Sequence, residues 1–218
     1  MVNETPSSPV YKKQRNDKIS LSSRPMTLPE KILAHHAVGL KESYIAPGQM
    51  LCVKVQWTLA CEITWKSMDK TYQDMGRPRI WKNDRFWLAV DHTVDPRVNH
   101  EAKQQMMISA AEDFAKEANL TEYQGVNQTI LHTEFYRQRA QPGQIVVGAD
   151  SHSCSTGGLG AFAIGLGAAD VVMPLVTGET WIQVPETVKI SFVGSPPFGL
   201  GGKGTILGCL QLDDNSYL

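Results

Sequence analysis

The order of apolar and polar residues predicts an alternation of helices and strands. Thr27-Leu28-Pro29-Glu30 has the form of a capping box with proline in the first turn, and the apolar spacing after it predicts a helix over 28–37. Residues 50–57 alternate between apolar and polar side chains, which predicts a strand with one buried face. By the same criteria we expect helices over 60–72, 100–119 and 168–176, and strands over 86–90, 144–149 and 188–193.

This alternation predicts the fold class and the domain boundaries. Strands that take turns with helices favour an α/β fold, with a mixed or mostly parallel sheet and flanking helices. We expect this domain to cover residues 26–204. Residues 1–25 have the composition of a disordered tail, and residues 205–218 look divergent or truncated, since the chain stops where a further helix is expected to continue.

Composition limits the possible binding partners and the cellular compartment of the protein. The formal net charge is -1, which gives no support for a nucleic-acid partner or for an anionic membrane surface. No apolar run approaches the roughly 18 residues that a membrane span needs. The four cysteines form no closely spaced pair, which favours a reducing intracellular compartment. The basic segment before Arg24 leaves two alternatives open, a disordered tail in a cytoplasmic protein or a mitochondrial transit peptide.

Candidate catalytic residues gather where predicted strands end. Asp91 and His92 follow one apolar run, Asp150 and His152 follow another, and His132 lies after an apolar turn. A histidine oriented by a carboxylate is the usual general acid or base near neutral pH. Adjacent residues on an extended strand point to opposite faces, so Asp91 and His92 need not bond to each other. Any one of these histidines could instead be structural, and their spacing does not indicate a metal site.

A glycine-rich run over 157–167 follows the second of these motifs. Its backbone N–H groups could bind an anion at a helix start, or its glycines could allow close packing of a helix against the sheet. The run matches neither the P-loop nor the dinucleotide-binding fingerprint. Beside it, Cys154 is predicted to be a small buried thiol, with a nucleophile as the alternative.

Several of these segments together resemble the aconitase superfamily, and most of all the large subunit of isopropylmalate dehydratase and homoaconitase. The resemblance covers residues 26–204, in matching order and spacing. Its carriers are Met26–Ala34, Pro47-Gly48 with Val53-Lys54-Val55, Val90-Asp91-His92, Ile130-Leu131-His132, Pro142-Gly143, Gly148–Ser153 with Gly157, Gly160 and Ala161 after it, and Thr180–Thr187. Of these, the Asp-Ser-His-Ser motif at 150–153 with its glycine-rich sequel is the most specific.

The resemblance implies a hydro-lyase that moves water between neighbouring carbons of a hydroxy di- or tricarboxylic acid. It implies that Asp91 and His92 protonate the departing hydroxyl group, and that His132 and Asp150 pair to orient a second histidine. The other implied roles belong to His152 beside the substrate, to Ser151 on a substrate carboxylate, and to Thr64 in a substrate-side segment over 62–66. The substrate class includes branched or extended malates of leucine or lysine biosynthesis, and leucine-like precursors of secondary metabolites.

The family also implies a [4Fe-4S] cluster, and here the chain departs from the pattern. The family's cluster cysteines lie in a Gly-Ser-Cys-Thr-Asn segment and a Cys-Gly-Pro-Cys segment, and neither occurs in these 218 residues. Cys52, Cys61, Cys154 and Cys209 occupy other positions, so we predict no metal ligands of the family type. Two alternatives follow, a hydro-lyase completed by a small subunit or a longer paralogue, and a catalytically inactive scaffold. RNA binding is disfavoured because the chain is not basic.

Overall fold

A computed structural model of the chain describes residues 24–212, and the elements within it confirm the α/β fold class. In chain order they are α1 (Leu28–His36), β1 (Met50–Lys54), β2 (Trp57–Cys61), α2 (Glu62–Asp74), β3 (Phe86–Ala89), α3 (Ala102–Glu117), β4 (Tyr123–Gln124), α4 (Leu131–Gln138), β5 (Ile145–Gly148), the 3-10 helix η1 (Ser151–Leu159), β6 (Phe162–Gly165), α5 (Ala168–Thr177), β7 (Glu179–Gln183) and α6 (Gly202–Leu212). The predicted N-terminal tail or transit peptide, and the last residues of the predicted C-terminal segment, lie outside the described residues.

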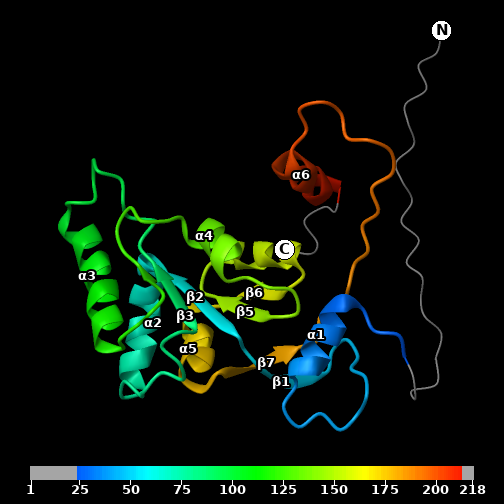
Figure 1. The fold of residues 1–218 in the computed structure, drawn as a ribbon, viewed down its shortest axis with the longest axis horizontal. Coiled ribbons are helices and arrows are strands. Elements are labelled where there is room, and N and C mark those ends of the chain that lie inside the picture. The colour runs from blue at the N-terminus through cyan, green and yellow to red at the C-terminus, as the bar shows by residue number, and fades with distance from the viewer. Residues whose placement is uncertain (1–23, 213–218) are drawn as a thin grey trace. The chain divides into compact units, whose positions relative to one another are not determined.

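Five strands form one parallel sheet in the order β4-β3-β2-β5-β6 (Figure 1). Each neighbouring pair in it is parallel, with Leu59 opposite Trp87 on one side and opposite Gly148 on the other. All five carboxyl ends therefore lie at one edge of the sheet, as a βα-wound sheet requires. The central strand β2 separates the ends of β3 and β5 at that edge.

Alternate residues of the central strands pack against two different layers of helices. One apolar cluster joins Leu88 and Val147 to Trp65 of α2 and Phe114 of α3, and it also includes residues of α5. The rings of Trp65 and Phe114 stack with their centroids 3.8 Å apart. Both faces of a parallel sheet are buried in this way, which explains why its strands are continuous apolar runs rather than alternating ones.

The opposite face of the sheet is covered by α4. There Leu59, Trp87 and Val146 pack on Phe135, in a second apolar cluster. The sequence prediction contained no helix at 131–138, because its two buried residues, Leu131 and Phe135, are too few to stand out as a helical pattern. This helix matters for the site, since it carries His132 in its first turn.

The predicted strand over 50–57 is two strands in two sheets. β1 pairs antiparallel with β7 in a separate two-stranded sheet, whereas β2 starts at Trp57 in the large sheet. Between them Gln56 holds the chain to β5, because its side-chain oxygen accepts a hydrogen bond from the Ile145 N–H at 2.7 Å. Alternation shows that residues are extended but not which sheet they join, so the break was not predictable from the pattern.

The predicted strand over 188–193 was wrong. The chain divides after Glu186 into two compact units, and in the second unit, which starts at Thr187, residues 188–193 form no strand. Val188 and Ile190 are exposed, with 59% and 54% of their surface accessible. Their alternation with polar residues therefore does not produce a strand, because no strand among the described residues pairs with this segment. The described regular structure of this second unit is α6.

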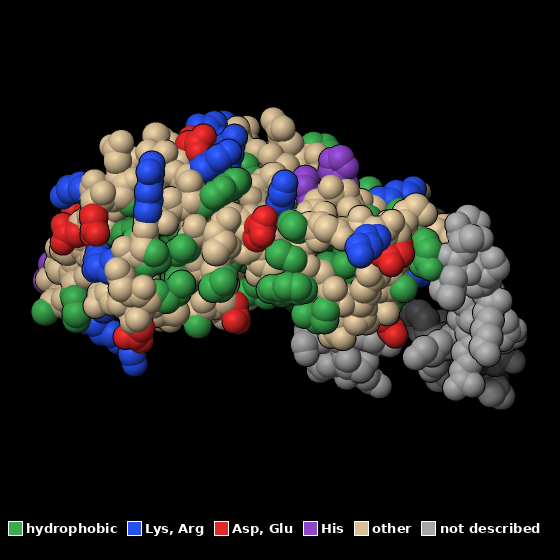
Figure 2. All heavy atoms as spheres, turned by 90° about the horizontal axis from the view of Figure 1, so that it is seen from below, with side chains coloured by type: hydrophobic (Ala, Val, Ile, Leu, Met, Phe, Trp, Pro, Cys, Tyr) green, Lys and Arg blue, Asp and Glu red, His purple; other side chains and the backbone are tan. Residues whose placement is uncertain are grey.

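No helix among the described residues is both long enough and apolar enough to cross a bilayer. On the face drawn in Figure 2, basic and acidic side chains are interspersed, with apolar side chains between them. This mixed surface agrees with the near-zero net charge and shows no continuous basic stripe on that face.

Two glycines at the ends of β5 and β6 allow η1 to fold back onto the sheet. Gly148 and Gly165 lie opposite each other in the strand pair. A Cβ atom on Gly165 would lie 2.8 Å from the carbonyl oxygen of Asp150 and 3.3 Å from the Ser151 Cα, both of them backbone atoms. The packing alternative for the glycine-rich run is therefore confirmed at Gly165, while the anion-binding alternative stays a prediction.

We predict that Gly165→Ala destabilises the fold by about 1–3 kcal/mol, because the new methyl group displaces backbone that cannot rotate away. The matched control is Gly157→Ala in η1, where an added Cβ has no neighbour within 4 Å. We expect this control to change stability by less than about 0.5 kcal/mol. Urea denaturation followed by circular dichroism measures both, and equal stabilities of the two variants would contradict the prediction.

Candidate active site

The predicted catalytic residues meet at the carboxyl edge of the parallel sheet. Asp91 and His92 follow β3, and Asp150 follows β5, on either side of the end of β2. His132 approaches the same point from the first turn of α4, and His152 from the first turn of η1. The structure thus brings together all five residues that the sequence named as catalytic.

The Asp150 carboxylate lies at the centre of this cluster. Its Oδ1 accepts hydrogen bonds from His132 Nε2 at 2.9 Å and from the backbone N–H of His152 at 2.7 Å, and it lies 3.0 Å from His152 Nδ1. Its Oδ2 lies 3.6 Å from His92 Nε2. Burial opposes ionisation of this carboxyl, but the hydrogen bonds from His132 and His152 outweigh it and lower the pKa of Asp150.

His92 is oriented by its own neighbour in the sequence. Asp91 Oδ1 lies 2.6 Å from His92 Nδ1, and Asp91 Oδ2 accepts the N–H of Leu131 at 2.7 Å, where α4 begins. The two side chains can bond because β3 ends at Ala89, so residues 91 and 92 have left the extended conformation that would separate them. The bond to Asp91, helped by the nearby Cys61 thiol, raises the pKa of His92 to about 11.

Glu62 is a further member of the site that the sequence prediction did not single out. Its side chain is fully buried at the start of α2, and it binds the loop that carries Asp91 and His92. It accepts the N–H groups of Asp91 at 3.1 Å, His92 at 3.0 Å and Thr93 at 2.5 Å, and the Thr93 hydroxyl at 2.8 Å. An acidic residue in the first helical turn directly after a buried strand was the signal that could have found it.

The two predicted substrate-binding residues differ in whether their hydroxyl groups are free to contact a substrate. The Ser151 side chain is exposed, with its Oγ 3.5 Å from His152 Nδ1. The Thr64 hydroxyl is already engaged, since it accepts the N–H of Cys61 at 2.9 Å and donates to the Cys61 carbonyl at 3.1 Å. Thr64 therefore caps α2, and a substrate contact by either residue stays a prediction.

The described cysteines do not form the three-thiolate site that an iron–sulfur cluster needs. Cys61 is buried, and Cys52 and Cys209 are half-buried. Cys154 is exposed, which corrects the prediction of a buried thiol there. The structure brings two groups of possible metal ligands together, Cys61 with Glu62 and His92, and His132 with Asp150 and His152. Neither group contains more than one cysteine, so within residues 24–186 no group of ligands fits a cluster.

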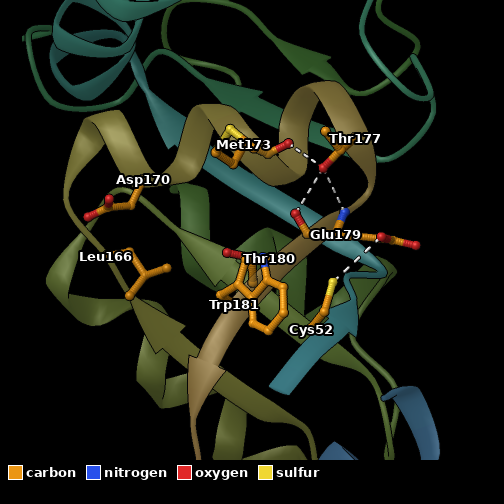
Figure 3. Close-up of a pocket in the computed structure, with 8 residues that line it drawn as sticks. All are labelled: Cys52, Leu166, Asp170, Met173, Thr177, Glu179, Thr180 and Trp181. Carbon is orange, nitrogen blue, oxygen red and sulfur yellow. Dashed lines mark hydrogen bonds between the residues drawn. The ribbon is translucent and has the colours of Figure 1, made fainter. Parts of the chain in front are cut away.

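A cavity of about 470 Å³ lies elsewhere in the same unit, between α5 and the small sheet (Figure 3). Its walls are largely apolar and include Leu166, Met173 and Trp181, with the Cys52 thiol bonded to the Glu179 carboxylate at 3.6 Å. It shares no lining residue with the histidine cluster. The cavity is therefore separate from the histidine cluster, and the sheet edge remains the candidate site.

Comparison with known proteins identifies the family of the chain. The family model for the aconitase family (aconitate hydratase) matches residues 30–213. The chain is 48% identical over 196 residues to Aconitase AMT8 of Alternaria alternata. This alignment covers 88% of the chain and 23% of that protein.

Two further relatives carry the name of another enzyme of this type. The chain is 45% identical over 199 residues to the 3-isopropylmalate dehydratase large subunit gloJ of Glarea lozoyensis, covering 91% of this chain and 21% of that protein. It is 35% identical over 197 residues to the 3-isopropylmalate dehydratase large subunit of Sulfurihydrogenibium sp., covering 88% of this chain and 44% of that protein. The chain thus spans less than half the length of these relatives. The match across most of its residues shows that it belongs to the aconitase family.

Proposed function

We propose that this chain forms one wall of the active site of a hydro-lyase that acts on a hydroxy di- or tricarboxylic acid. The observation that carries this proposal is the Asp150 carboxylate, which two histidines contact directly and a third approaches to 3.6 Å. Such an arrangement holds several imidazoles at one open edge of the sheet, where a polyanionic substrate can meet them. Family membership supplies the reaction class.

His92 is suited to protonate the departing hydroxyl group. Its raised pKa keeps the imidazole protonated at neutral pH, with Asp91 compensating the charge. Hydroxide is a far stronger base than imidazole, because the pKa of water is about 15.7, so transfer of this proton becomes favourable as the carbon–oxygen bond breaks. The Nε2 side of the ring is the side available for this transfer, since Nδ1 is bonded to Asp91.

The remaining residues position the substrate. Asp150 fixes the rings of His132 and His152 and stays ionised, so that it can hold these donors in place. His152, whose side chain is 78% exposed, and Ser151 next to it present an imidazole and a hydroxyl to a substrate carboxylate. These assignments, together with a contact from Thr64, come from the family resemblance, and the geometry supports them for all but Thr64.

Completion of the active site requires residues beyond those described. We propose that the chain acts with a small subunit or with a longer paralogue, since the relatives named as large subunits imply a smaller partner. The iron–sulfur cluster implied by the family then has to be held with cysteines outside residues 24–186, because no group of possible ligands within those residues contains more than one cysteine. This last observation also favours the second candidate, an inactive scaffold subunit. We also propose that the protein is intracellular, either in the cytoplasm or in mitochondria.

The first prediction for the proposed function concerns substrate binding. We expect 2-isopropylmalate, or a related hydroxy diacid, to shift the imidazole NMR resonances of His92 and His152. Asp150→Asn should weaken this binding at least about tenfold, because the histidines lose the carboxylate that orients them. Asp170→Asn, an exposed acid of α5, is the matched control and should bind like the wild type. Unshifted histidine resonances at saturating diacid would contradict the proposed binding role.

The reaction itself is tested in the complex with the co-purified partner chain. We expect the complex to dehydrate the hydroxy diacid to the unsaturated acid, and the ultraviolet absorbance of this product measures the rate. The Asp150→Asn complex should lose this activity. A complex that contains the cluster-bearing partner, binds the diacid and still shows no dehydration would establish the scaffold and overturn the hydro-lyase.

The second prediction concerns the pH dependence of His92. An NMR titration should show this imidazole protonated throughout the neutral range, with a pKa near the value of about 11 that its bond to Asp91 produces. Because the pKa is raised in the folded state, its contribution to stability is complete below about pH 6.5 and is lost as the pH rises through the folded value. Asp91→Asn should return the pKa toward its ordinary value.

The matched control for this titration is Asp95→Asn. Asp95 is an acid four residues further along the chain that pairs with Arg97 at 2.6 Å. The His92 pKa should be the same in this variant as in the wild type. A His92 resonance that titrates near pH 6.5 in the wild type, or an unchanged pKa in Asp91→Asn, would overturn the assigned cause.

A further inference from the structure

Three potential metal ligands, one of them His92 of the histidine cluster, meet where β2 and β3 end. Cys61 is the last residue of β2, Glu62 is the first residue of α2, and His92 lies in the loop after β3. One ligand atom from each residue lies within 4.8 Å of the ligand atoms of the other two. The parallel pairing of β2 with β3 creates this meeting, because it places residue 61 opposite residue 89 and brings the following loop over the start of α2.

The three groups form a donor set that transition metals of the zinc type prefer. A thiolate, an imidazole and a carboxylate are all established zinc ligands, and a thiolate disfavours magnesium and calcium. Two ligand atoms on one tetrahedral zinc ion lie about 3.5 Å apart. The present atoms lie within 4.8 Å of one another, so metal binding requires them to move closer together.

Glu62 supplies the second, independent observation. Its carboxylate is fully buried, and within residues 24–212 no lysine or arginine forms an ion pair with it. Three of its four hydrogen bonds fall on Oε1, while Oε2 accepts only the N–H of Asp91. Oε2 thus keeps a lone pair for a cation, and a bound cation would compensate a charge whose burial is otherwise costly.

His92 has the orientation that metal-binding histidines usually have. Its Nδ1 is bonded to the Asp91 carboxylate at 2.6 Å, which leaves Nε2 as the ring nitrogen available to a metal. Its side chain is 37% exposed, whereas Cys61 and Glu62 are buried. The site is therefore closed on the protein side and open on the solvent side, where water or a further ligand completes the coordination.

We propose that Cys61, Glu62 and His92 bind a divalent cation of the zinc type, separate from any iron–sulfur cluster. The bound ion occupies Nε2 of His92, the same nitrogen that faces Asp150 Oδ2. Metal binding and proton transfer by His92 therefore exclude each other, and the cation acts as an inhibitor of the site. The binding itself does not depend on the proposed hydro-lyase reaction.

The test uses the whole chain, freed of metal by a chelator and titrated with Zn²⁺ against a chromophoric indicator, and with Co²⁺ as a spectroscopic probe. We expect one strong site per chain, with a thiolate-to-cobalt charge-transfer band in the near ultraviolet. Cys61→Ser should remove this band, and both Cys61→Ser and His92→Ala should weaken Zn²⁺ binding at least about tenfold. Circular dichroism verifies that the variants are folded, and His92→Ala removes a side chain that is 37% exposed.

The matched control is Cys52→Ser. Cys52 also places a thiol beside a carboxylate, with its Sγ 3.6 Å from Glu179 Oε2, but it lies outside the proposed site. This variant should keep the charge-transfer band and the wild-type affinity. The proposal is overturned if the band survives in Cys61→Ser, if it disappears in Cys52→Ser, or if folded His92→Ala binds Zn²⁺ as tightly as the wild type. Substrate binding is measured without metal, so failure of this site leaves the hydro-lyase proposal intact.

Discussion

The parallel pairing of β3, β2 and β5 is the constraint on which the rest of the site depends. It aligns three carboxyl ends at one edge of the sheet, so that the polar residues following each strand are neighbours in space although they lie about 30 and 60 positions apart in the chain. Both faces of these strands are covered by helices, which fixes their register because a slip of one residue would turn every buried side chain to the wrong layer. The position of His92 relative to Asp150 follows from this register.

Three carboxylates convert that alignment into a defined geometry. Glu62 binds the backbone of residues 91–93, Asp91 binds the first N–H of α4, and Asp150 binds the N–H of His152 at the start of η1. Two of them, Asp91 and Asp150, also contact the histidines themselves. Each of these acids thus holds a chain segment by accepting one or more of its backbone N–H groups. The acid-rich edge is for this reason a structural framework as much as a set of reacting groups.

The histidines are held firmly on the protein side and left accessible on the other. His132 is largely covered, His92 is partly exposed and His152 is mostly exposed, so the cluster presents a graded surface rather than a closed pocket. One wall of an active site has this form, and the lengths of the aconitase-family relatives leave ample chain for the opposite wall. His92 takes part in both the proposed proton transfer and the proposed cation site. Whether its Nε2 carries a proton or a metal ion therefore decides which of the two roles His92 has.

The sequence alone predicted the α/β class, a helix over 28–37 and apolar strands over 86–90 and 144–149, and the structure agrees with each bound to within one residue. It also named the five candidate residues that meet at the sheet edge, because short apolar runs and acid–histidine pairs are local features. It did not determine that residues 50–57 divide between two sheets, that residues 188–193 lack a partner strand, or that a helix, α4, carries His132. The pairing of His132 with Asp150, which the resemblance implied, is present. Nor did the sequence reveal Glu62, whose importance lies in hydrogen bonds to residues about 30 positions away. Only the tertiary structure decides such matters, because strand pairing, burial of a charge and the hydrogen bonds of Glu62 depend on contacts between distant segments, which no local pattern encodes.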